Sequence, residues 1–148
     1  MRYPVLAASF VLLVACAKNE PAPEAAAPPP PPALTPADFA GTWNTSVTLT
    51  GVEKPVETVI TGSADGMTWS LSAAGRDPVT LTASISGDSL VLVSSEYESF
   101  VRKGTMVTTR VANVKSGEML MGSVIATYKS ASGEEVVTGT SHSTKATQ

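Results

Sequence analysis

The chain has 148 residues, with 10 basic and 13 acidic side chains and a formal net charge of −3. This balance leaves no basic patch of the kind that nucleic acids require, so we expect no nucleic-acid partner. A single cysteine excludes an intramolecular disulfide, and a single histidine excludes a metal site built on two histidines. We expect neither a metal nor a cofactor.

The first fifteen residues, 1–15, have the layout of a secretory signal. Arg2 precedes an apolar run over residues 5–15, and polar residues follow from Lys18. A membrane-spanning helix needs roughly 20 apolar residues, so this run is too short for one and is typical of an export signal. The alternative, a buried core helix, is disfavoured because the proline-rich segment that follows cannot fold against it.

The apolar run ends in Leu13-Val14-Ala15-Cys16, which resembles the lipobox of bacterial lipoproteins. The resemblance implies cleavage before Cys16, a diacylglycerol thioether on its sulfur, and acylation of the new N-terminus, for example with palmitate. Two or more acyl chains anchor a protein stably where one binds only marginally, so the membrane becomes a partner through Cys16. Ala17 stands where aspartate would signal inner-membrane retention, so the resemblance implies the cell envelope, and the outer membrane in a Gram-negative cell.

Residues 16–36 join this cysteine to a linker rich in proline and alanine. Eight of the chain's 11 prolines lie between Pro21 and Pro36. Proline fixes φ and removes a hydrogen-bond donor, which predicts an extended spacer that contributes nothing to the fold. A proline-rich docking ligand for a partner protein is the alternative interpretation.

Residues 37–148 are predicted to form one all-β domain. Apolar and polar residues alternate with a period of two, and threonine and valine are abundant. Turn signals, with glycine or proline beside small polar residues, separate the runs. This spacing predicts an antiparallel meander of eight or nine strands, either a barrel or a sandwich. The clearest runs are residues 43–49, 67–73, 79–85, 90–93, 106–114, 119–128 and 135–140.

The segment Ala40-Gly41-Thr42-Trp43 resembles the opening strand of lipocalin-like (calycin) barrels and of avidin-type barrels. The resemblance implies a β-barrel whose tryptophans, Trp43 and Trp69, contact a small apolar ligand; ordinary core packing is the alternative for both. Avidin-type biotin sites use several tryptophans where this chain has two, so the resemblance implies the barrel rather than biotin. The apolar phase of the strands predicts an interior made of Trp43, Trp69, Leu71, Leu81, Ile85, Leu92, Val107, Met121 and Ile125.

No catalytic constellation is recognisable in the sequence. The sequence has no nucleophile-elbow motif whose serine could form a catalytic triad with His142. Glu96 and Glu98 are interpreted as a solvated strand face opposite a buried Tyr97. We therefore expect a protein that is not an enzyme. Two functions stay open: an envelope module that binds a small apolar ligand, and a structural or accessory lipoprotein that contacts another envelope protein. An empty apolar cavity would favour the first.

Overall fold

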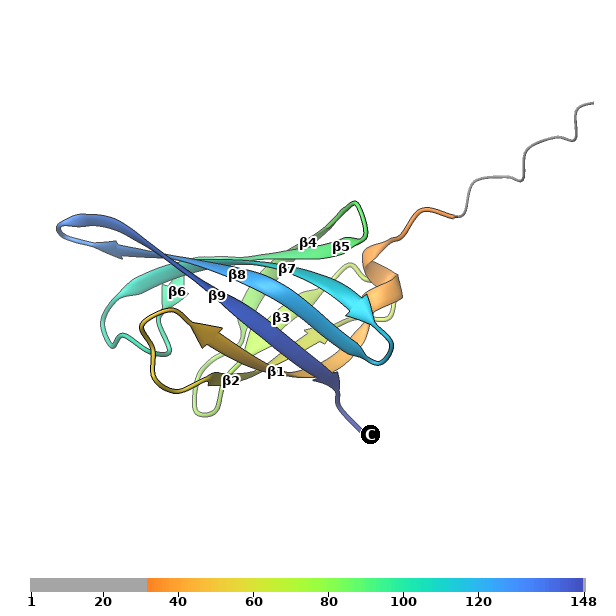
Figure 1. The fold of residues 1–148 in the computed structure, drawn as a ribbon, viewed down its shortest axis with the longest axis horizontal. Coiled ribbons are helices and arrows are strands. Elements are labelled where there is room, and N and C mark those ends of the chain that lie inside the picture. Colours follow the sequence, from red (N-terminus) through yellow and green to blue (C-terminus); the bar gives the residue numbers. More distant parts are fainter. Residues whose placement is uncertain (1–31, 148) are drawn as a thin grey trace, which may run out of the picture. The chain divides into compact units, whose positions relative to one another are not determined.

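A computed structural model describes residues 32–147, which form one 3-10 helix and nine strands (Figure 1). The predicted signal, Cys16 and linker residues 17–31 lie outside these residues. Within residues 32–147, no helix is long and apolar enough to span a membrane. The elements are η1 (Pro36–Phe39), β1 (Gly41–Leu49), β2 (Val56–Gly62), β3 (Trp69–Ser72), β4 (Val79–Ser86), β5 (Ser89–Ser94), β6 (Tyr97–Glu98), β7 (Met106–Ser116), β8 (Met119–Ser130) and β9 (Gly133–Lys145).

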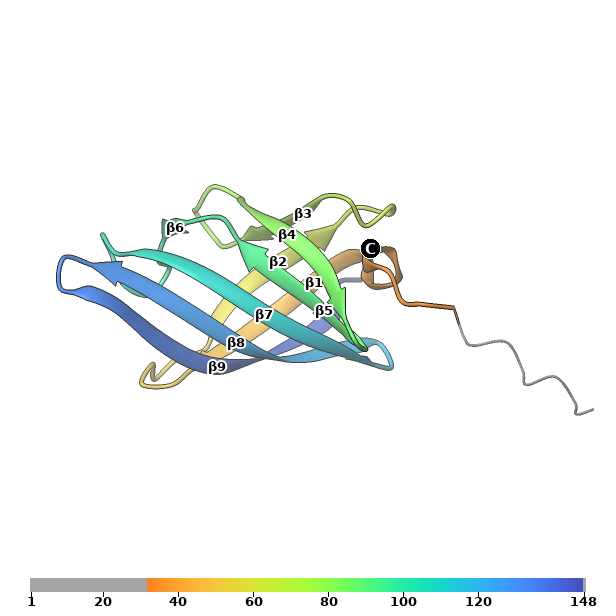
Figure 2. The same cartoon turned by 90° about the horizontal axis from the view of Figure 1, so that it is seen from above.

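The strands form a closed antiparallel barrel. They follow the order β5-β4-β3-β2-β1-β9-β8-β7, and a further antiparallel pairing of β5 with β7 closes the ring. The two-residue strand β6 pairs with the start of β7 and lies outside this ring of eight. Figure 2 shows the strands wrapping around a common axis. The predicted all-β meander is thus confirmed as a barrel, and an eight-stranded barrel has an interior just wide enough for side chains or one small ligand.

One end of the barrel is closed by large side chains. Phe39 of η1 packs there with Trp43 and Trp69, and each of the three is 1% exposed. The indole N–H of Trp43 donates to the Phe39 carbonyl at 2.9 Å, and that of Trp69 donates to the Gly66 carbonyl at 2.9 Å. Gly62, the cross-strand partner of Trp69, leaves the space that the indole fills, since a Cβ at position 62 would collide with the ring. These side chains therefore fill the interior at this end of the barrel.

The helix η1 extends the domain slightly beyond the predicted boundary. The sequence assigned Thr35 and Pro36 to the linker, but Pro36 begins the helix and Thr35 caps it. The Thr35 backbone N–H and hydroxyl both donate to the Asp38 carboxylate, at 2.7 and 2.9 Å. These hydrogen bonds hold the pKa of Asp38 below its ordinary value, with the backbone bond as the larger cause.

The predicted interior is correct except on β8. Met121 and Ile125 of β8 are 52% and 37% exposed, and their neighbours point inward instead. Both phases of β8 are apolar, so periodicity could not select the inward one. Ile85 is half-buried and packs against the core cluster at the closed end, as predicted. The inward residues of β8 are Leu120, Val124, Ala126 and Tyr128, and the residues confirmed as buried are Trp43, Trp69, Leu71, Leu81, Leu92 and Val107.

Strand β9 is longer than the predicted run 135–140. It continues to Lys145, pairing with β1 up to that residue and with β8 up to Thr144. Ser141 and Ser143 point inward and are buried, whereas His142 between them is exposed. Small polar residues carry little hydrophobic signal, which is why the sequence placed this end of the strand in an exposed terminus.

Candidate ligand-binding site

An apolar cavity lies in the half of the barrel away from the tryptophans. Its volume is about 60 Å³. Small-molecule pockets usually enclose roughly 300–1,000 Å³, so a ligand of more than a few atoms requires the surrounding side chains to move. The apolar lining consists of Val47, Leu49, Val56, Ile60, Leu71, Phe100, Val101, Val107, Val111, Val124 and Ala126.

One wall of the cavity is polar. Thr45, Thr58 and Ser141 line it, and Thr45 shares a hydrogen bond of 2.8 Å with Ser143. The Ser141 hydroxyl donates to the side-chain carbonyl of Asn113 at 2.8 Å. The hydroxyls of Thr45, Thr58 and Ser141 thus already have partners within the protein, and the surface that the cavity presents to a ligand is mainly apolar.

Asn113 stands behind this wall, on β7. It is fully buried, and its amide nitrogen has no hydrogen-bond partner among the residues that the structure describes. Gly122 of β8 lies between Asn113 and Ser141 in the sheet, and a Cβ at position 122 would collide with the Asn113 side chain. The glycine therefore lets the two polar side chains meet across β8.

The mouth of the cavity is covered by residues 99–105, which we call the mouth loop. Phe100 and Val101 of this loop face the cavity, and the Phe100 ring packs against Tyr97 with a centroid distance of 4.9 Å. The buried hydroxyl of Ser99 accepts hydrogen bonds from the backbone N–H groups of Val101 and Arg102, both at 3.1 Å. Ser99 thereby fixes a tight turn at which the half-buried Phe100 and the 37% exposed Val101 border the cavity.

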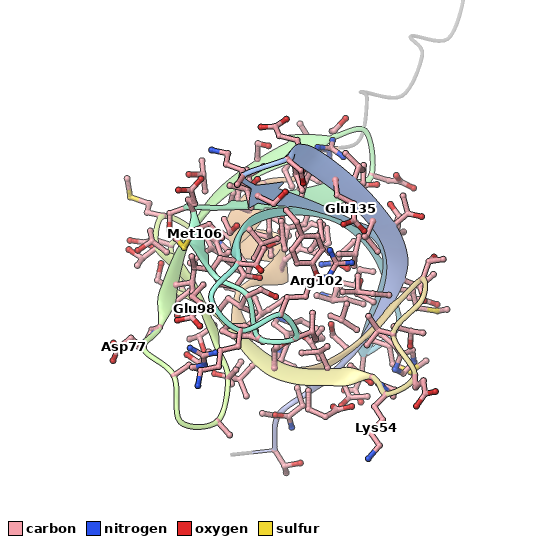
Figure 3. All side chains as sticks on the ribbon, turned by 90° about the vertical axis from the view of Figure 1, so that its left-hand side faces the viewer. Lys54, Asp77, Glu98, Arg102, Met106 and Glu135 are labelled. Carbon is pink, nitrogen blue, oxygen red and sulfur yellow. The ribbon has the colours of Figure 1, made fainter. Side chains whose placement is uncertain are left out.

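Arg102 fastens the mouth loop to the long hairpin of β8 and β9. Its guanidinium donates two hydrogen bonds to the Glu135 carboxylate, at 2.7 and 2.9 Å. The same group lies 4.1 Å above the ring centroid of Tyr128, which lines the cavity. This paired geometry lowers the pKa of Glu135 and raises that of Arg102, in each case mainly through their hydrogen bonds. Figure 3 looks onto this end and shows Arg102 within the ring of strands, with Glu135 nearby.

Glu96 and Glu98 each take part in an ion pair on the rim. Glu96 pairs with Lys129 at 2.6 Å and raises the pKa of that lysine. Glu98 accepts a hydrogen bond from the Gly104 backbone N–H at 2.9 Å and pairs with Arg76 at 3.4 Å, and both contacts lower its pKa. Both carboxylates thus have structural partners. Tyr97 between them is half-buried, and burial raises its pKa.

The tryptophans predicted to touch a ligand lie away from the cavity. Trp43 and Trp69 belong to the closed end, and neither lines the cavity. Their geometry is that of core packing, and ligand contact by either stays a prediction. Sequence reasoning missed Phe100, Arg102 and Tyr128. One signal was present, since Phe100 and Val101 are two large apolar residues inside a turn, where polar residues are usual.

No protein-family model matches the sequence, and no curated protein is significantly similar to it. Among solved structures, a bradavidin2–biotin complex is 19% identical, with a TM-score of 0.47; the match covers 72% of this chain and 96% of that one. A rhizavidin–biotin complex is 13% identical, with a TM-score of 0.43, and the match covers 72% and 99% of the two chains. The strand pairing alone defines the closed barrel, and these distant likenesses add nothing to it.

Proposed function

We propose that this protein is a lipid-anchored envelope protein whose barrel binds a small apolar ligand. The anchor rests on the Leu13-Val14-Ala15-Cys16 pattern at the end of a short apolar run. The binding role rests on an apolar cavity whose lining includes Phe100 and Val101 of the mouth loop.

A ligand larger than the cavity has to displace side chains of the mouth loop. Phe100 and Val101 come from the loop, whereas Val124 and Ala126 come from the fixed wall of β8. A ligand that displaces the loop residues outward gains contact with this wall, at roughly 25 cal/mol for each Å² of apolar surface buried. The proposed ligand is therefore small and mainly apolar.

Binding can be tested with the chain carrying Cys16→Ser, which avoids detergent. A panel that includes 1-octanol, retinol and biotin should contain a compound that binds saturably and raises the melting temperature by mass action. Ala126→Phe fills the cavity from β8 and should abolish the effect. Thr82→Phe, on the exposed face of β4, is the matched control and should leave it intact. Absence of saturable binding across the panel would refute the binding role.

The anchor has its own test. In its native cell the chain should incorporate a fatty-acid analogue, and Cys16→Ser should abolish the labelling because the thioether needs the cysteine sulfur. Labelling that persists in the Cys16→Ser variant would refute lipidation at this residue without affecting the binding role.

A second candidate function, contact with another envelope protein, is supported by the outer face of β5, β7 and β8. Met121 and Val114 are direct cross-strand partners, 52% and 39% exposed. Ile125 pairs with Arg110, whose other partner is the exposed Val93. Exposed apolar side chains that adjoin in this way mark interaction surfaces more often than scattered ones do.

This second function predicts where a partner would cross-link. A photoreactive residue in place of Met121 should give a discrete adduct in cells, and one in place of Thr82, on the polar face of β4, should give none. Equal labelling at both positions would indicate random collision and would leave the ligand-binding role as the better account.

A further inference from the structure

The guanidinium of Arg102 has the chemistry of an anion site at the edge of the cavity. We infer that Arg102 selects ligands that carry a terminal carboxylate, and that this carboxylate takes the place of Glu135. The inference rests on the proposed binding function and names its ligand class: an amphiphile with an apolar chain and one carboxylate.

The position of Arg102 places its charge where the head of such a ligand would lie. Its guanidinium covers the ring of Tyr128, and that ring is part of the cavity lining. Val101, the preceding residue, also faces the cavity. A molecule with its chain among Val107, Val124 and Ala126 would therefore bring a terminal group out beside Arg102 (Figure 3).

The geometry of the existing pair shows what Arg102 recognises. Two nearly equal hydrogen bonds, of 2.7 and 2.9 Å, join it to both oxygens of Glu135. A planar guanidinium fork matches a carboxylate in this way, whereas a lysine ammonium would act as a point charge. The Glu135 carboxylate thus occupies the position that a ligand carboxylate would take.

Glu135 is readily displaced. Its side chain is 59% exposed and lies near the tip of the β8–β9 hairpin, so it can turn into water without leaving a buried charge. Water can solvate the Glu135 carboxylate after it leaves Arg102, so the cost of displacement is the loss of two hydrogen bonds, which a ligand carboxylate would replace. A ligand carboxylate has an advantage over the Glu135 carboxylate, because apolar contacts between the ligand's chain and the cavity add to the free energy of binding.

Other rim cations are less suited to this role. Arg76 contacts Glu98 and the Ser99 carbonyl only at 3.4 Å, and Lys129 is paired with Glu96 away from Tyr128. Neither places a guanidinium on a ring that lines the cavity. Arg76 therefore offers a matched control for Arg102.

The experiment compares octanoate with 1-octanol, which share a chain length and differ in the head group. At pH 7.5 the chain carrying Cys16→Ser should bind octanoate about 10-fold more tightly than 1-octanol, as one charge-assisted pair allows. Arg102→Gln should remove this preference and leave 1-octanol binding within about threefold of its original value. Glu135→Gln should tighten octanoate binding by about threefold or more, because a competing carboxylate is gone, and should leave 1-octanol binding unchanged.

The Glu135→Gln variant distinguishes two roles of Arg102: recognition of a ligand carboxylate, and holding the mouth loop closed through its ion pair with Glu135. If Arg102 and Glu135 only hold the mouth loop closed, both substitutions will change octanoate and octanol binding alike, and the inference fails while the binding function stands. Arg76→Gln should preserve the preference for octanoate, and a loss there equal to that of Arg102→Gln would also overturn the assignment. If the unsubstituted site binds neither compound but binds another uncharged member of the panel, the inference alone fails. If it binds nothing, the proposed function fails with it.

Discussion

Single residues at the closed end show how this barrel accommodates large side chains that each carry one polar atom. The indole nitrogens of Trp43 and Trp69 both find backbone carbonyls, in η1 and in the β2–β3 turn. A buried N–H without a partner would cost about 1–3 kcal/mol, so these two hydrogen bonds allow the rings to be fully enclosed. Gly62 supplies the remaining requirement, which is space for the Trp69 ring.

Trp69→Ala should destabilise the domain by about 3–5 kcal/mol, because removing a buried ring leaves a cavity that the rigid barrel cannot close. Urea unfolding followed by circular dichroism measures this change. Met67→Ala, at a side chain that is 84% exposed, is the control and should change the free energy of unfolding by less than about 0.5 kcal/mol. Similar effects of the two substitutions would contradict the packing described for Trp69.

The ion pair at the mouth should be visible in titration. Arg102 lowers the pKa of Glu135 below the ordinary 4.5. The pair's contribution to stability is therefore complete above pH 4.5 and is lost as the pH falls through the lowered value. Arg102→Gln should raise the Glu135 pKa toward 4.5, measured by carboxyl NMR. Arg76→Gln should leave Glu135 unchanged and raise only the pKa of Glu98, partly, because the Gly104 hydrogen bond persists.

At the scale of elements, the short helix η1 acts as part of the core. It carries Phe39 into the closed end and offers the carbonyl that accepts the Trp43 N–H. The capping contacts between Thr35 and Asp38 set its start. A segment that sequence reasoning divided between linker and domain thus fills one end of the barrel.

Truncation tests this role. A chain that starts at Pro32 should melt at the same temperature as one that starts at Ala17, because it keeps all of η1. A chain that starts at Ala40 loses the buried Phe39, and its melting temperature should fall by more than about 10 °C, as losing 3 kcal/mol or more implies. An unchanged melting temperature for the Ala40 start would show that the barrel closes without η1.

At the scale of the whole molecule, the ring of eight strands joins the two halves into one unit. One cluster of buried side chains fills the closed end and another surrounds the cavity, and Tyr97 packs against both. The described chain enters at the closed end, opposite the mouth loop (Figure 1).

We expect a single cooperative unfolding transition, because a closed ring exposes no edge strand that could fray independently. Tryptophan fluorescence reports on the closed end, and the ring NMR signals of Tyr97 and Tyr128 report on the mouth. The two denaturant midpoints should coincide within error. An earlier midpoint at the tyrosines would show that the mouth half unfolds on its own.

The sequence alone determined the strand content and the turns. Alternation of apolar and polar residues marked most strands, and glycines marked turns; Gly87 and Gly117, for example, adopt positive φ in the β4–β5 and β7–β8 turns. It also predicted that Trp43 and Trp69 would be buried. Such features are local, because period and turn chemistry act over a few residues.

The tertiary structure alone decided which phase of β8 faces inward, how the ring closes and which side chains meet at the cavity mouth. Met121 and Leu120 are both apolar, and only the register against β7 and β9 turns Leu120 inward. Arg102 and Glu135 lie 33 residues apart and meet because the β8–β9 hairpin extends to the mouth loop. Contacts of this kind depend on how distant strands pair, which no local pattern encodes.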